Sequence, residues 1–138
     1  MAELKRLVKV GSAEERRVSH TYQKLQAERR TFKSSFDGLE RERKSILAKY
    51  KLNPGASKEE NNRYLGLAVA FISIDDNGRM TNTVSDDEVD DFLSSYSASL
   101  RKRVKEMNAQ YRKLAEFKRR IEGQSDEYNE AVRAIRYQ

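Results

Sequence analysis

The chain has 138 residues, of which 37% are hydrophobic and 36% are charged, and its net charge is +6. Because it contains no cysteine, disulfides, thiol catalysis and cysteine metal sites are excluded. The longest apolar run, residues 67–72, is too short to span a membrane, and the first residues lack the apolar core of a signal peptide. We therefore expect a soluble protein, intracellular (cytoplasmic) or associated with a virion, with no membrane insertion.

The charge is unevenly distributed along the chain. Residues 1–52 carry a net charge of +7, residues 53–91 carry −6, and residues 92–138 carry +5. We divide the chain into a basic arm (1–52), an acidic central head (53–85) and a second basic arm (86–138) of one elongated module. An asymmetry of this kind concerns binding partners rather than the fold.

The first arm is predicted to form one long helix. A short amphipathic piece over residues 2–10 comes first, and Ser12 with Glu15 has the spacing of a capping box, which starts a helix. Gly38 costs roughly 1 kcal/mol relative to alanine. The apolar phase is unchanged across it, however, so we expect the helix to continue until Pro54 ends it. The seam positions of this arm include Val18, Tyr22, Leu25, Phe32, Phe36, Leu39 and Ile46.

The central head combines a short helix with strand and turn signals. A second capping box, at residues 57–60, predicts a helix over residues 58–70. The following residues have strand character on either side of Asn77-Gly78, a dipeptide that favours a tight hairpin turn. The sequence leaves open whether residues 68–84 form a β-hairpin or continue as helix.

The second arm is predicted to form one uninterrupted helix that starts at a third capping box, Ser85 with Glu88, and ends near Arg136. Its apolar stripe is wider than a two-helix seam needs, because Val104 and Tyr111 add to it. We therefore expect a third or fourth helix, from a second copy or a partner, to cover the rest. The seven-residue repeat of this arm is Leu93, Leu100, Met107, Leu114, Ile121, Tyr128 and Ile135.

Two long helices around a compact turn region favour an antiparallel arrangement. The predicted fold is all-α, or mainly so: a long antiparallel helical hairpin or coiled coil with a small central head of one helix and a β-hairpin. Arg29, Arg43 and Arg103 fall on the seam of this hairpin, where each should extend to solvent or meet a carboxylate.

The sequence contains no pattern of catalytic or metal-binding residues. His20 is the only histidine and faces solvent on the predicted helix. Residues 73–84 fail as a calcium loop, because Ser73 and Val84 stand at positions that need carboxylates. A capped helix start explains the acidic residues 86–91. We predict a protein that is not an enzyme, binds no cofactor or metal, and has no small-molecule substrate.

Basic clusters on both arms are a candidate surface for nucleic acid or an acidic partner, because phosphate binding needs several cations on one face. Interleaved Glu28, Glu40 and Glu106 instead favour a solvated surface of ion pairs. The candidate residues are Arg16, Arg17, Arg30, Lys44, Arg101, Lys102, Lys105, Lys118, Arg119 and Arg120.

Residues 64–74 are the most apolar stretch of the chain. We interpret them as the core of the head or, alternatively, as a docking surface formed by Tyr64, Leu65, Leu67, Phe71 and Ile72. The function that fits these features best is protein–protein assembly, as an adaptor, stalk or structural subunit, with a protein partner or a second copy bound along the seams. The alternatives are a nucleic-acid-binding module that uses the basic arms and a holdase-type chaperone that clasps clients between them.

Overall fold

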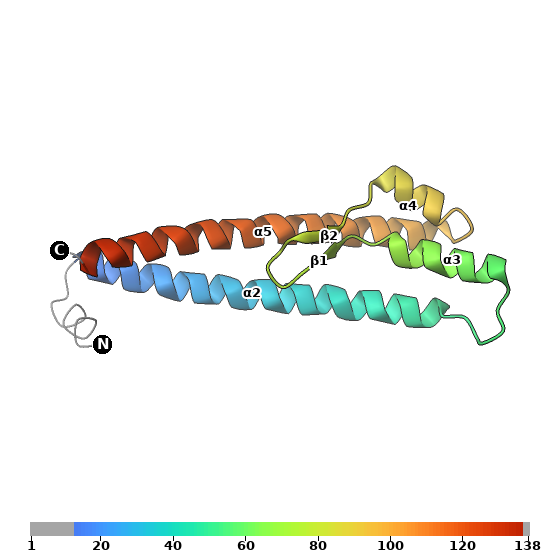
Figure 1. Ribbon diagram of the computed structural model, residues 1–138, viewed down its shortest axis with the longest axis horizontal. Coiled ribbons are helices and arrows are strands. Elements are labelled where there is room, and N and C mark those ends of the chain that lie inside the picture. The colour runs from blue at the N-terminus through green and yellow to red at the C-terminus, as the bar shows by residue number, and fades with distance from the viewer. Residues whose placement is uncertain (1–12, 137–138) are drawn as a thin grey trace.

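Two long helices determine the shape of the molecule. The computed structural model describes residues 13–136, in which α2 (Ala13–Tyr50) and α5 (Ala98–Arg136) run antiparallel along the long axis (Figure 1). Between them in sequence lie the short elements that we call the head, namely α3 (Lys58–Val69), β1 (Ser73–Ile74), β2 (Met80–Asn82) and α4 (Asp86–Phe92). This arrangement confirms the predicted helical hairpin with a small central head. The predicted piece at residues 2–10 and the capping residue Ser12 lie outside the described residues.

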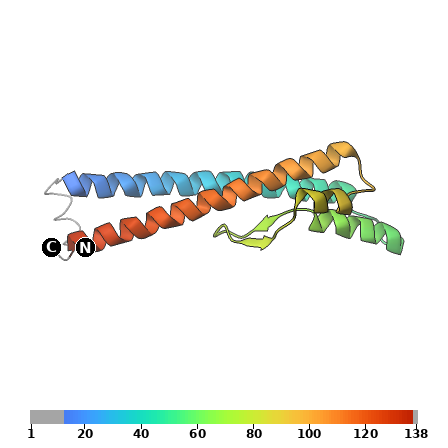
Figure 2. The same cartoon turned by 90° about the horizontal axis from the view of Figure 1, so that it is seen from above.

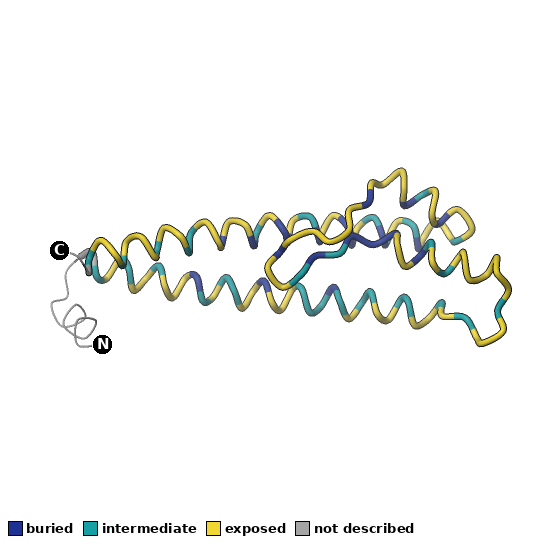
Figure 3. The backbone as a smooth tube through the Cα atoms, in the orientation of Figure 1, coloured by how far each residue is buried: buried dark blue, intermediate teal, exposed yellow. Residues whose placement is uncertain are grey.

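The side chains along the seam between α2 and α5 are buried in its middle and more exposed at one end. Tyr22 is 48% exposed, and Val18, Tyr128 and Ile135 are half-buried near the end at which Ala13 lies. Figure 3 shows burial concentrated toward the half of the hairpin that carries the head. The predicted seam residues that are buried are Leu25, Phe32, Leu39, Leu93, Leu100, Met107, Leu114 and Ile121.

The head packs along one half of α5, as both views of the molecule show (Figure 1, Figure 2). It buries a compact apolar cluster against Val104, Tyr111 and Ala115 of α5, and each of these is at most 1% exposed. The wide stripe of α5 is therefore filled by the chain's own head in this half, and the expected helix from a second copy is not needed there. The head residues of the cluster are Leu67, Ala70, Phe71, Ile72, Ile74, Val84 and Val89.

The prediction of one helix from residue 86 onward was wrong, because α4 ends at Phe92 and a second helix, α5, begins at Ala98. Leu93 is fully buried at the end of α4, and α5 starts anew behind Ser97, whose hydroxyl accepts a hydrogen bond from the Leu100 backbone N–H at 3.2 Å. Leu93 and Leu100 keep the seven-residue spacing although Leu93 is the C-cap of α4 and Leu100 belongs to α5. The heptad pattern therefore does not reveal that one helix ends and another begins between these residues.

Close contacts hold the parts of the head together. A Cβ on Gly66 would lie 2.9 Å from the Phe92 carbonyl oxygen, so the absence of a side chain lets α3 approach the end of α4. Within residues 68–84, β1 and β2 form an antiparallel β-hairpin, whereas Ala68 and Val69 still belong to α3. The strands are shorter than the sequence suggests. The tight turn of the hairpin is made by Gly78 at φ +78°, and a Cβ there would lie 2.5 Å from Lys118 Cβ. The hairpin tip therefore rests directly on α5.

Candidate functional site

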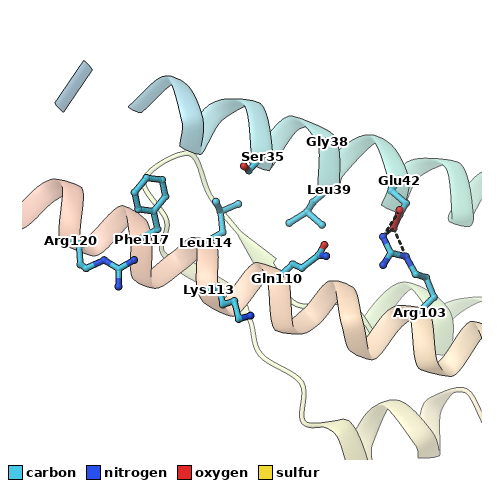
Figure 4. Close-up of a pocket in the computed structure, with 10 residues that line it drawn as sticks. All are labelled: Ser35, Gly38, Leu39, Glu42, Arg103, Gln110, Lys113, Leu114, Phe117 and Arg120. Carbon is cyan, nitrogen blue, oxygen red and sulfur yellow. Dashed lines mark hydrogen bonds and ion pairs between the residues drawn. The ribbon is translucent and has the colours of Figure 1, made fainter. Parts of the chain in front are cut away.

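An open groove of about 560 Å³ runs between α2 and α5 (Figure 4). Its floor is apolar and consists of Leu39, Leu114 and Phe117, of which the phenylalanine is half-buried. Gly38 contributes no side chain, which keeps the α2 wall low. The remaining lining residues are polar or charged, namely Ser35, Glu42, Arg103, Gln110, Lys113 and Arg120.

The groove lies on the face of the hairpin opposite the head. Asn108 and Tyr111 of α5 point toward the head side, since Asn108 bonds to the head backbone and Tyr111 belongs to the shared core. Lys113 follows Tyr111 by two residues and therefore points about 200° around the helix from it. Head and groove thus occupy the two broad sides of one flat pair of helices.

The groove carries cations that are not neutralised. Arg103 donates from Nε to Glu42 at 2.8 Å and pairs with Glu106 at 3.2 Å, and the hydrogen bond to Glu42 is the main cause that raises the Arg103 pKa. Within the described residues, no carboxylate lies within ion-pair distance of Lys113 or Arg120; Arg120 contacts the Phe117 ring at 6.0 Å. The groove therefore presents an apolar floor with a positive rim.

The arginines on the seam are all satisfied within the chain. Arg29 donates to the Ser125 hydroxyl at 3.0 Å, and Arg103 meets Glu42 as expected for a seam arginine. Arg43 reaches the head, where it donates to the Ile72 carbonyl at 3.3 Å, and it also pairs with Glu40. The polar seam positions thus join α2 to α5 and α2 to the head.

Tyr111 gives the hairpin a dependence on alkaline pH. The side chain is fully buried and its hydroxyl donates to Glu40 at 2.9 Å; burial first, and then this hydrogen bond, raises the Tyr111 pKa above 10. An unfolded tyrosine loses its proton near pH 10, so this stabilisation is present below pH 10 and falls as the pH rises further. We expect Tyr111→Phe to reduce the pH dependence of the unfolding free energy above about pH 10 by up to ~1.4 kcal/mol per pH unit.

Urea unfolding of both proteins at about pH 8 and about pH 11 measures this difference. Tyr22→Phe is the matched control, because it makes the same change at a side chain that is 48% exposed. Equal slopes for Tyr111→Phe and the unchanged protein would contradict the assignment.

The candidate basic residues do not all face a common surface. Arg101 donates to the Tyr96 carbonyl at 2.8 Å, and Lys105 pairs with Asp90 of α4 at 2.7 Å. Lys118 is buried to 9% exposure, with its ammonium 5.0 Å from the centre of the Phe32 ring. These three residues hold the fold together. The candidates that are exposed are Arg16, Arg17, Arg30, Lys44, Lys102, Arg119 and Arg120.

The predicted docking surface of the head is mostly core. Leu67, Phe71 and Ile72 are at most 1% exposed, so the docking hypothesis was wrong for these three, which belong to the core of the head. Tyr64 is half-buried. Leu65 alone of the proposed set is exposed, at 58%. With Val69 at 45% and Phe92 at 39%, it forms an exposed apolar set that we call the head patch. Sequence reasoning missed Val69 and Phe92, although Leu65 and Val69 have the spacing of one helix face.

The described residues contain no group of carboxylates and histidines that could hold a metal ion. His20 is exposed, as predicted. Across the same part of the chain, every helix is too polar or too short to traverse a bilayer. Comparisons with protein-family models, curated proteins and solved structures find no match to this chain.

Proposed function

We propose that the chain is a non-enzymatic interaction and assembly module that binds a helix of its partner in the groove between α2 and α5. The observation that carries this proposal is the apolar floor of Leu39, Leu114 and Phe117 under a rim of unneutralised cations. A groove between two helices suits a third helix that lays its apolar face onto the floor. The proposed surface overlaps the predicted seam, since Leu39 and Leu114 are seam residues that are 9% and 7% exposed, and the half-buried Phe117 adds to the floor.

The rim determines the kind of helix that fits. Lys113 and Arg120 favour a partner with acidic residues beside its apolar face, since opposite charges steer association and like charges oppose it. The lining runs from Arg103 to Arg120 of α5, which corresponds to about 26 Å of helix. A partner helix of about 18 residues would fill it.

A synthetic amphipathic peptide tests this proposal. The probe is a helix of about 18 residues with leucines on one face and glutamates beside them, compared with a peptide in which lysines replace the glutamates. Fluorescence anisotropy should show binding of the acidic peptide only, and Lys113→Glu with Arg120→Glu should reverse the preference. The matched control is Lys44→Glu with Arg119→Glu, which makes the same charge change at exposed positions outside the groove. Unchanged peptide preference in the groove variant contradicts the proposal.

The same titration with labelled DNA and RNA separates the alternatives. Phosphate-driven binding falls by orders of magnitude between about 50 and 200 mM salt. Tight binding that collapses over this range would replace the proposal with nucleic-acid recognition by the exposed cations. Suppression of aggregation of unrelated clients, without selective binding of the acidic peptide, would favour a holdase instead.

A further inference from the structure

The head patch has the properties that the groove requires of a ligand. Leu65 and Val69 lie one turn apart on the exposed face of α3, and the close approach at Gly66 places Phe92 of α4 against the same helix. Glu88 precedes Phe92 by one turn on α4 and is exposed. The head patch thus combines an apolar ridge on α3 with the acidic helix α4 beside it.

Size and charge of the two surfaces agree. α3 has 12 residues, or about 18 Å, and fits within the groove of about 26 Å. Residues 53–91 carry a net charge of −6, whereas residues 92–138, which supply the cations of the rim, carry +5. A ridge of Leu65 and Val69 on the groove floor would bring the acidic side of α4 toward the basic rim.

We propose that the partner of the groove is the head of a second copy of this chain. The inference rests on the proposed function, because it names the helix that the groove binds. Head and groove are different surfaces, so the contact is heterologous, and they lie on opposite broad sides of the molecule. Two copies therefore cannot place both heads in both grooves at once. When the head of one copy occupies the groove of another, the first copy keeps a free groove and the second keeps a free head. The chain therefore stacks head to groove into assemblies larger than a dimer, either closed rings or open filaments.

Two variants that each block one surface test this inference. The head variant, Leu65→Gln with Val69→Gln, removes the apolar ridge at exposed positions, and the groove variant, Lys113→Glu with Arg120→Glu, repels the acidic head. Sedimentation velocity at concentrations up to about 1 mM should show species larger than dimers for the unchanged chain. Each variant alone should remain monomeric.

An equimolar mixture of the variants gives the decisive result. The intact groove of the head variant accepts the intact head of the groove variant, so the mixture should form a dimer of one copy of each and nothing larger. Circular dichroism and the thermal midpoint of each variant confirm that both are folded. The surface control Lys44→Glu with Arg119→Glu should associate like the unchanged chain.

Other outcomes overturn the inference. A chain that stays monomeric up to about 1 mM, one that stops at a dimer, or variants that associate like the unchanged chain would each show that the head does not occupy the groove. Binding of the acidic peptide is measured separately. If the peptide binds while the chain does not self-associate, the groove keeps its proposed function and only the identity of the partner is lost.

Discussion

Replacing Asn108 with leucine is expected to release the head from α5 and to lower the free energy of unfolding by about 2–5 kcal/mol. Asn108 is fully buried; its Oδ1 accepts from the Ile72 N–H at 2.8 Å and its Nδ2 donates to the Ala70 carbonyl at 2.9 Å. The side chain thereby acts as a neighbouring strand would for this segment. Leucine has the same number of side-chain heavy atoms as asparagine and branches at the same carbon, so the main effect is that two buried backbone groups lose their partners.

Urea unfolding gives the size of this loss, and amide hydrogen exchange of residues 70–74 locates it. Gln110→Leu is the matched control, because Gln110 is an exposed amide side chain two residues further along the same helix and should change stability by less than about 0.5 kcal/mol. A loss below about 1 kcal/mol for Asn108→Leu would mean that water or another group satisfies the head backbone.

Gly78→Ala is expected to lift the β-hairpin off α5 and to cost about 2 kcal/mol or more. The added Cβ would lie 2.5 Å from Lys118 Cβ, an atom close to the backbone that cannot swing away. The positive φ of +78° adds conformational strain of roughly 1 kcal/mol. Unfolding in urea measures the total, and exchange of the Arg79 amide, which donates to Asp75, reports the turn.

Gly55→Ala separates the two contributions. Gly55 has a φ of +91°, yet a Cβ there would meet nothing within 4 Å. It therefore measures strain alone. If Gly78→Ala costs no more than Gly55→Ala, the hairpin tip does not press on Lys118 as the structure shows.

The sequence predicted the long helices well and their interruptions poorly. An unbroken heptad phase across Gly38 indicated one helix, and α2 does continue there. The same phase between Leu93 and Leu100 indicated continuity where α4 ends and α5 begins. The seven-residue apolar repeat shows only which residues face the core. Two helices that pack on the same core can keep this repeat across the residues that connect them. The hydroxyl of Ser97, as a cap for α5, was the local signal of a new helix.

The candidate groove could not be read from the sequence, because it depends on how the head folds back. Periodicity showed that α5 has more apolar surface than one seam uses, but not whether the chain itself covers it. Once the head occupies the side of Val104 and Tyr111, the remaining open side is that of Phe117 and Lys113. Basic residues were likewise found by composition, whereas only the fold shows that Lys105 is paired with Asp90.

The antiparallel pairing of α2 and α5 determines the order in which the contacts between these two helices are lost. Contacts between them link residues 61 apart at Glu42 and Arg103, and 96 apart at Arg29 and Ser125. Closing the longer loop costs only about 0.4 kcal/mol more than closing the shorter one. Once the head has joined the two arms, the contacts between α2 and α5 therefore form one after another, starting beside the head. We expect local unfolding to follow the reverse order: the seam is most exposed at the end near Ala13, so that end should open at a lower free energy than the half that carries the head.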